Sequence, residues 1–272
     1  MDDLERHRQD LHAHVLGKNR TWLFAHPDAV LTHEQQERYD ALCVRLENGE
    51  PLAQLLGEAW FYGRPFTVTR DTLIPRPETE MIITMLLGSG SGTANGVHIV
   101  DIGTGSGCIA VTAAAELQDA QVIATDVSSA ALAIATHNAT RHGVAERIEF
   151  LHGNLLEPIL QRPHLHRASC IVTANLPYLT TAEWEALPRP LKDFEPRSAF
   201  DGGIDGLDPY RAIFMQLPQL AARSLMLDAF LEIDPRRRDA LMQWTASMLP
   251  DWTATLHTDL AGHARVLKLA AP

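Results

Sequence analysis

The chain has 272 residues, 46% of them hydrophobic, and this size allows one substantial core with a small appended domain. Its formal net charge of −11 weighs against an RNA or DNA partner, because phosphate contacts need a basic surface, and favours a basic protein partner. The N-terminus lacks the pattern of a secretory signal and no apolar run is long enough to span a bilayer, so we expect a cytoplasmic protein without a membrane segment.

The cysteines and histidines predict neither disulfides nor a metal site. Cys43, Cys108 and Cys170 are far apart and embedded in apolar patterns, which is typical of reduced core residues. The 13 histidines lack cysteine or carboxylate partners at the spacing of metal ligands. We therefore expect no bound metal.

The N-terminal part of the chain, residues 1–58, is predicted as a helical domain. Thr32 to Gln35 form a capping-box sequence at a helix start, and Asn48-Gly49 predicts the end of that helix. Residues 60–69 are rich in aromatic and β-forming residues and predict a short hairpin. We assign residues 59–76 as a hairpin linker to the next domain.

A glycine-rich turn follows the first strand predicted after this linker, residues 97–102. The turn is Gly103-Thr104-Gly105-Ser106-Gly107, and a helix-compatible segment follows it. Glycines at alternate positions allow a sharp turn and a close approach to a ligand. A dinucleotide fingerprint has its third glycine one residue later, so this spacing suits S-adenosylmethionine better.

The next two predicted strands each end in a polar residue. Residues 120–125 lead into Asp126, whose carboxylate can accept hydrogen bonds from both hydroxyls of a ribose. Residues 147–151 are followed by Gly153-Asn154, where Asn154 is either a hydrogen-bond partner for an adenine base or an ordinary turn residue.

The sequence Asn175-Leu176-Pro177-Tyr178 follows a buried strand pattern at residues 169–174. It therefore lies at the carboxyl edge of the sheet, where open α/β sheets bind ligands. Asn175 offers a carbonyl acceptor, and Pro177 favours an extended Leu176 whose carbonyl can point beside it. With the ring of Tyr178 these groups form a receptor for a planar NH₂ group; the alternative is an ordinary exit from a strand.

From about residue 77 the predicted strands alternate with helices, which indicates a doubly wound α/β domain with a parallel sheet over residues 77–272. Late strands at residues 228–233 and 264–269 would complete the sheet. The glycine- and serine-rich tract at residues 88–96 predicts a loop before the first strand.

Several motifs together resemble one family, the release-factor glutamine methyltransferases of the HemK/PrmC type, within the class I S-adenosylmethionine-dependent methyltransferases. Besides the glycine turn, the matching segments are Gly49–Gly57, Leu73–Glu80, Glu195–Arg197, Asp201–Leu207 and Asp259–Gly262. The likeness covers nearly the whole chain. One departure is Leu176, because the family usually reads Asn-Pro-Pro-Tyr; the Asn-Leu-Pro-Tyr form is familiar from ribosomal RNA adenine methyltransferases.

The resemblance implies a Rossmann-like sheet of seven strands with a small N-terminal helical domain and a hairpin linker. It implies methyl transfer from S-adenosylmethionine to the side-chain amide nitrogen of the glutamine in the Gly-Gly-Gln loop of peptide-chain release factors, with no nucleic acid or membrane as partner. The alternative is an adenine methyltransferase acting on RNA or DNA, because an exocyclic amino group presents the same planar NH₂.

The expected site follows from these motifs. We expect Arg76 either to position the substrate loop or to clamp the two domains, and the Asn-Leu-Pro-Tyr segment to perform catalysis and bind the substrate. The residues expected to bind the cofactor are Asp101, Gly103, Thr104, Gly105, Ser106, Gly107, Asp126, Asn154 and Asn175.

Overall fold

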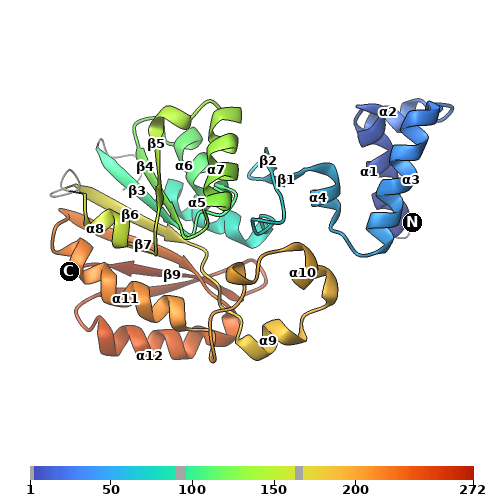
Figure 1. Cartoon of the computed structure of the whole chain (residues 1–272). Coiled ribbons are helices and arrows are strands. Elements are labelled where there is room, and N and C mark those ends of the chain that lie inside the picture. Colours follow the sequence, from blue (N-terminus) through green and yellow to red (C-terminus); the bar gives the residue numbers. More distant parts are fainter. Residues whose placement is uncertain (1–2, 90–95, 163–167) are drawn as a thin grey trace.

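A seven-stranded sheet lies at the centre of the computed structural model, which describes residues 3–89, 96–162 and 168–272 (Figure 1). Most of the tract predicted as a loop at residues 88–96 lies outside the described residues. The strands are β3 (Val97–Ile102), β4 (Gln121–Asp126), β5 (Ile148–His152), β6 (Ser169–Ala174), β7 (Met226–Glu232), β8 (Thr253–Thr258) and β9 (Ala264–Ala270).

Helices cover both faces of this sheet (Figure 1). On one face lie α5 (Glu80–Gly88), α6 (Cys108–Glu116) and α7 (Ser129–Arg141), and on the other α8 (Glu157–Leu160), α11 (Asp208–Ala221) and α12 (Arg238–Met248). Two further short helices, α9 (Thr181–Ala186) and α10 (Arg189–Phe194), follow β6.

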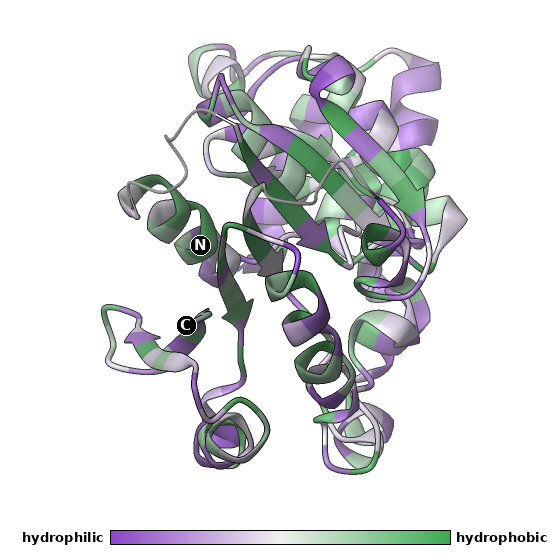
Figure 2. Ribbon diagram, turned by 90° about the vertical axis from the view of Figure 1, so that its left-hand side faces the viewer, coloured by the Kyte–Doolittle hydropathy of each residue, from purple (hydrophilic) through white to green (hydrophobic). Residues whose placement is uncertain are grey.

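Alternate residues of the strands face the two helix layers. In β3, Val97 and Ile99 pack in the cluster with α5 and α6, whereas Val100 and Ile102 pack in the cluster with α11, and all are at most 1% exposed. Strands buried on both faces are continuously apolar, and Figure 2 shows the central strands as mainly hydrophobic. The predicted strands at 97–102 and 169–174 are confirmed to the residue.

The strand order is β5-β4-β3-β6-β7-β9-β8. The doubly wound fold with seven strands is confirmed, but the sheet is not parallel throughout, because β9 runs antiparallel to both β7 and β8. Strand β8 was not among the predicted strands: its Thr-Ala-Thr-Leu-His-Thr sequence is half-exposed at the edge of the sheet and carries little apolar signal.

The order of the strands reverses between β3 and β6. From β3 the chain continues outward to β4 and β5, and then returns to place β6 on the other side of β3. Ile102 pairs with Ala174, so the loops after β3 and β6 leave the sheet side by side. Ligands of doubly wound proteins bind at this switch point.

The N-terminal helices are α1 (Asp3–Leu16), α2 (Arg20–Ala25), α3 (His33–Glu47) and α4 (Leu52–Leu56), and the first three project away from the sheet (Figure 1). They share a small core of Leu11, Val15, Leu42 and Leu55. The predicted capping box at the start of α3 is confirmed, since Thr32 Oγ1 accepts from Gln35 N at 3.3 Å.

The hairpin of β1 (Glu58–Phe61) and β2 (Arg64–Thr67) packs on the sheet domain. Phe61 and Phe66 are 1% and 0% exposed within the cluster of α5 and α6. Asn138 on α7 accepts from Thr67 N at 2.8 Å and donates to the Ser106 carbonyl at 2.8 Å. One buried amide thus ties the hairpin to the glycine turn.

None of the described helices is both long and apolar enough to cross a membrane. Across residues 3–89, 96–162 and 168–272, no cluster of three or more histidine, cysteine, aspartate or glutamate side chains has the geometry of a metal site. Cys108 and Cys170 are buried, Cys43 is half-buried, and all three are free thiols.

Candidate active site

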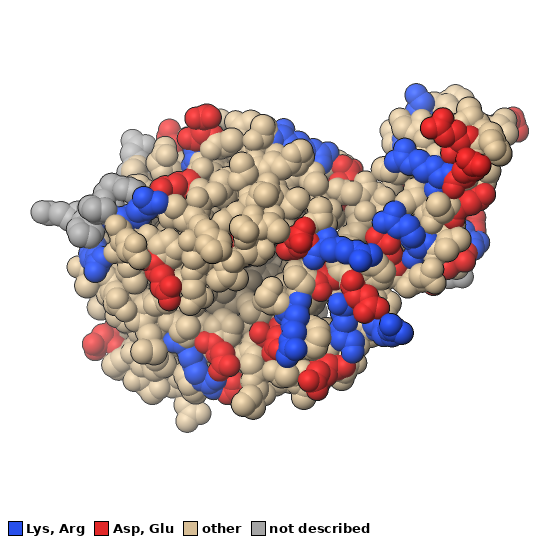
Figure 3. All heavy atoms as spheres, in the orientation of Figure 1, with Lys and Arg blue, Asp and Glu red and all other residues tan. Residues whose placement is uncertain are grey.

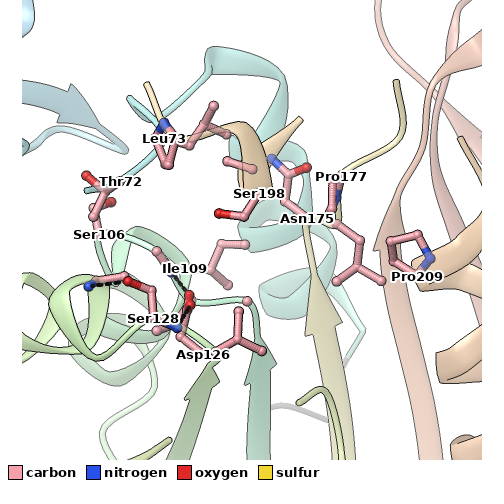
Figure 4. A pocket seen from close by; sticks show the side chains of 18 of the residues that line it. Thr72, Leu73, Ser106, Ile109, Asp126, Ser128, Asn175, Pro177, Ser198 and Pro209 are labelled. Atoms are coloured by element: carbon pink, nitrogen blue, oxygen red, sulfur yellow. Dashed lines mark hydrogen bonds between the residues drawn. The ribbon is translucent and has the colours of Figure 1, made fainter. Parts of the chain in front are cut away.

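A cavity of about 240 Å³ opens at the carboxyl edge of the sheet, between the loops that follow β3, β4, β5 and β6. In Figure 4, Asp126 and Ser128 lie on one side of this cavity and Asn175 and Pro177 on the other. Ten of the residues expected from the sequence line it: Arg76, Gly103, Thr104, Gly105, Ser106, Asp126, Asn154, Asn175, Leu176 and Pro177. Asp101, Gly107 and Tyr178 do not.

The glycine turn has the backbone that the sequence predicts. Gly103, Gly105 and Gly107 have φ values of 66°, 55° and 81°, which favour glycine. A Cβ on Gly107 would also lie 3.1 Å from the Ala135 backbone, so this glycine allows α6 to pack closely against α7. Gly107 does not line the cavity itself, but it helps to set the shape of the turn that does.

Asp126 holds the turn in place. Its Oδ2 accepts from Gly105 N at 2.9 Å and its Oδ1 from Ser128 N at 2.8 Å. A carboxylate has about four lone-pair sites, so both oxygens retain capacity for a ligand's hydroxyls. Asp126 is thus both part of the wall and available as an acceptor.

Asp101 lies beneath the turn, fully buried and outside the lining of the cavity, so its expected part in cofactor binding stays a prediction. It accepts from Thr104 Oγ1 at 2.7 Å and from Thr173 Oγ1 at 3.0 Å, which joins the turn to β6. Burial raises the pKa of Asp101 to about 7, against the opposing effect of these hydroxyl donors.

Asn154 lines the cavity but is exposed, and it is also a turn residue. Its Nδ2 donates to Glu157 Oε1 at 3.3 Å, and its carbonyl accepts from Glu157 N at 3.0 Å. Both alternatives that the sequence left open are therefore compatible with its position.

Asn175 directly follows the carboxyl end of β6, and its side-chain nitrogen forms a hydrogen bond with Thr79. Asn175 Nδ2 donates to Thr79 Oγ1 at 3.0 Å. Within the part of the chain that the structure describes, no hydrogen bond ends on Asn175 Oδ1. The carbonyl oxygen is thus the atom that this residue offers to a ligand.

Leu176 and Tyr178, from the same segment, also pack against the core. The Leu176 side chain is 3% exposed and belongs to the main core cluster, so position 176 provides packing as well as a backbone carbonyl. Tyr178 packs against the same cluster, and burial, together with the charges of Glu232 and Asp234, raises its pKa to about 12. Tyr178 is not among the residues that line the cavity, and its expected packing on a planar substrate amide stays a prediction.

The loop of residues 201–207 supports this segment from behind. Leu179 N donates to the Phe200 carbonyl at 2.9 Å, and Gly202 N donates back to the Leu179 carbonyl at 2.8 Å. A Cβ on Gly206 would lie 2.3 Å from the Tyr178 carbonyl oxygen. The glycines of this motif therefore allow two backbones to touch.

Arg76 joins the linker to the domain of residues 77–272, and its two expected roles, positioning the substrate loop or clamping the two domains, both stay predictions. Its Nη2 donates to Glu195 Oε1 at 2.7 Å, and Glu195 Oε2 accepts from Ile74 N at 2.8 Å. The Glu195 side chain is fully buried, so these contacts fix the linker to the segment after α10. Arg76 also reaches the cavity wall.

Sequence reasoning missed part of the lining, and of the residues named next only Leu73 and Thr79 belong to a motif that was already noted. These residues include Thr72, Leu73, Thr79, Ser128, Ser198 and Pro209. Thr72 Oγ1 is buried and has no partner among the described residues, and a buried polar group of this kind is a place for a ligand atom to bond. The sequence signal that could have indicated Thr72 is its position directly before the linker motif Leu73–Glu80.

Comparison with known proteins decides the family. A profile described as PrmC N-terminal domain matches residues 5–57, and one described as Methyltransferase domain matches residues 99–193. A release factor glutamine methyltransferase of Nitratidesulfovibrio vulgaris is 43% identical over 204 residues, 75% of this chain and 67% of that protein. One of Chlorobaculum tepidum is 37% identical over 225 residues, 81% and 76% of the two chains. The chain belongs to the release factor glutamine methyltransferase family.

More distant relatives extend the match. A release factor glutamine methyltransferase of Enterococcus faecalis is 32% identical over 252 residues, which cover 92% of this chain and 86% of that protein. Among solved structures, the N-terminal domain of human METTL16 in complex with SAH has a TM-score of 0.55 at 17% identity, covering 88% of this chain and 82% of that one. That second likeness concerns the fold alone.

As a member of the release factor glutamine methyltransferase family, the chain is an S-adenosylmethionine-dependent methyltransferase. The cavity fits this cofactor: the glycine turn and Asp126 would hold its ribose end, and the apolar Ile109 and Ala131 line the wall beside them. The Thr72 hydroxyl, which has no partner within the described part of the chain, would add a polar contact on the linker side.

Proposed function

We propose that this enzyme transfers a methyl group from S-adenosylmethionine to the side-chain amide nitrogen of the glutamine in the Gly-Gly-Gln loop of peptide-chain release factors. The observation that carries the proposal is the Asn175 amide, whose Oδ1 is available beside the glycine turn. The names of the relatives at 37–43% identity support the same substrate.

The chemistry of an amide explains why the site needs acceptors. An amide nitrogen is a poor nucleophile, because its lone pair is delocalised into the carbonyl. The cofactor supplies an electrophilic methyl group. Asn175 Oδ1 and the Leu176 carbonyl would accept the two N–H groups, orient the NH₂ and stabilise the positive charge that develops on it.

The remaining expected residues have different roles in the proposed site. Asp126 and the backbone of Gly103 to Ser106 would hold the cofactor, with Asn154 at its base end. Arg76 and Pro177 would shape the entrance for the substrate loop. Asp101 and Gly107 would act on the cofactor through the turn that they support.

We also propose that residues 1–58 dock the release factor, with residues 59–76 as the linker to the catalytic domain at residues 77–272. Their small separate core and their projection away from the sheet support a docking role (Figure 1). Because release factors act in translation termination, we place the enzyme in the cytoplasm.

The distribution of charges does not favour a basic protein surface for binding nucleic acid. On the face in Figure 3, basic side chains lie beside acidic ones around the hollow. Several arginines near the cavity form ion pairs, for example Arg197 with Asp201 at 2.7 Å and Arg76 with Glu195. Phosphate binding would compete with these ion pairs.

The test is a labelling experiment with three acceptors. The enzyme is incubated with methyl-labelled S-adenosylmethionine and a release factor, a ribosomal protein or an RNA. We expect label in the release factor alone, and loss of that label when the Gly-Gly-Gln glutamine is changed to asparagine, whose shorter side chain does not reach the acceptors. Label in RNA would support the adenine methyltransferase instead.

A further inference from the structure

A chain of hydrogen bonds runs from Asn175 into the core of the molecule. Asn175 Nδ2 donates to Thr79 Oγ1 at 3.0 Å, and Thr79 Oγ1 donates to Glu232 Oε2 at 2.7 Å. Glu232 ends β7, and because Ala174 pairs with Leu231, the residues Asn175 and Glu232 lie next to each other across the sheet. Thr79 reaches them from the linker motif, just before α5.

The chemistry of the three groups fixes the direction of these bonds. An ionised carboxylate can only accept, and a threonine hydroxyl has a single proton to donate. Once that proton is given to Glu232, Thr79 Oγ1 can only accept from its other neighbour. Asn175 must then turn its NH₂ toward Thr79, which leaves its Oδ1 on the opposite side, toward the ligand.

Glu232 has features of a functional group and few of a structural one. Its residue is 3% exposed, and none of the ion pairs among the described residues includes it. A buried carboxylate outside any ion pair is costly to the fold, and such groups concentrate at functional sites. Tyr210 donates to the Glu232 carbonyl at 2.6 Å, which fixes the end of the strand.

We propose that Thr79 and Glu232 are positioning residues, which hold the Asn175 amide so that its Oδ1 faces the NH₂ group to be methylated. The inference rests on the proposed function, because it assigns the orientation of the acceptor used there. We call the hydrogen bonds from Asn175 to Thr79 and from Thr79 to Glu232 the relay. Without the relay, the Asn175 amide turns by 180° in part of the molecules and presents two N–H donors to the NH₂ of the substrate.

The test compares isosteric and conservative variants of Thr79. Thr79→Val keeps the shape and removes the hydroxyl, whereas Thr79→Ser keeps the hydroxyl. Thr84→Val is a matched control, because the Thr84 hydroxyl bonds only a helix carbonyl, Glu80 O, on the exposed face of α5. For each enzyme, kcat and KM for the release factor, the affinity for S-adenosylmethionine and the melting temperature are measured.

We expect Thr79→Val to lower kcat by roughly tenfold to a hundredfold, the cost of misplacing a reacting group, with little change in cofactor affinity. Thr79→Ser should recover most of the rate, and Thr84→Val should stay within about twofold, as an ordinary surface change does. A folded Thr79→Val enzyme with the wild-type kcat would overturn the proposal, as would a Thr79→Ser enzyme that is equally slow.

If Thr79→Val melts far below the wild type, Glu232→Gln decides the question. Its side chain has the same shape, but its NH₂ can donate to Thr79, so the order of donors is no longer enforced. A lower kcat with unchanged cofactor affinity supports the relay, and an unchanged kcat refutes it. A wild-type enzyme that leaves the release factor unmodified would instead refute the proposed function itself.

Discussion

At the scale of single residues, the site depends on which groups can donate and which can only accept. Burial raises the pKa of Glu232 to about 7, against the lowering effect of its bond from Thr79 and of the charges of Arg265 and Arg76; the charge of Glu78 raises it further. Below pH 7 the carboxyl is largely neutral and no longer compels Thr79 to donate to it.

We therefore expect kcat for release factor methylation to fall as the pH is lowered through about 7, the pKa to which Glu232 is raised. The measurement is a pH–rate profile of the wild type and of Glu232→Gln, which has no proton to gain. The step near pH 7 should disappear in Glu232→Gln; the same step in both enzymes would assign it to another group.

Leu176, where the family usually has proline, separates the backbone contribution from the side-chain contribution. Leu176→Pro retains the carbonyl and the extended geometry that Pro177 favours, so methylation by the folded enzyme should stay within about tenfold. Because the Leu176 side chain is 3% exposed, the substitution should also cost about 1–3 kcal/mol of stability. Methylation rates and urea unfolding measure the two effects, and a rate as low as that of Asn175→Ala would show that the leucine shapes the pocket.

At the scale of elements, close backbone contact places the Asn-Leu-Pro-Tyr segment. Gly206 and Gly262 both have positive φ, 76° and 83°, but only at Gly206 would a Cβ collide with a neighbour, the Tyr178 carbonyl at 2.3 Å. Gly206→Ala should therefore lower both the melting temperature and kcat. Gly262→Ala, the control, should cost only the backbone strain of about 1 kcal/mol. Equal effects of the two variants would mean that the 201–207 loop does not support the site.

The sequence predicted those elements whose signals are local. The glycine turn, Asp126 and Asn175 each follow a strongly apolar strand, so their meeting at one edge of the sheet could be deduced from strand direction alone. Strand β8 was not predicted, because a half-exposed edge strand has little apolar pattern in its sequence. The roles of Thr79 and Glu232 could not be predicted, since the two residues lie 153 positions apart in the sequence and meet only in the folded domain.

At the scale of the whole molecule, we propose distinct tasks for the N-terminal helices and for the cavity. Helix α4 is tied to the catalytic domain, since Gln54 Nε2 donates to the Phe194 carbonyl at 2.5 Å, whereas α1 to α3 project outward (Figure 1). Deleting residues 1–48 should leave cofactor affinity and methylation of a short Gly-Gly-Gln peptide unchanged, and sharply lower methylation of the intact release factor. Calorimetry and rate assays measure these effects; an undiminished rate on the intact protein would exclude the docking role.

In the proposed mechanism, the Asn175 acceptor directs the methyl group to one amide nitrogen of the substrate. The most direct measurement is tandem mass spectrometry of a release factor after reaction with the wild type or with Asn175→Ala. We predict one added methyl on the side chain of the Gly-Gly-Gln glutamine with the wild type, and a rate lower by about 10²–10³ with Asn175→Ala. A methyl group on another residue, or full activity of the Asn175→Ala enzyme, would contradict the claim.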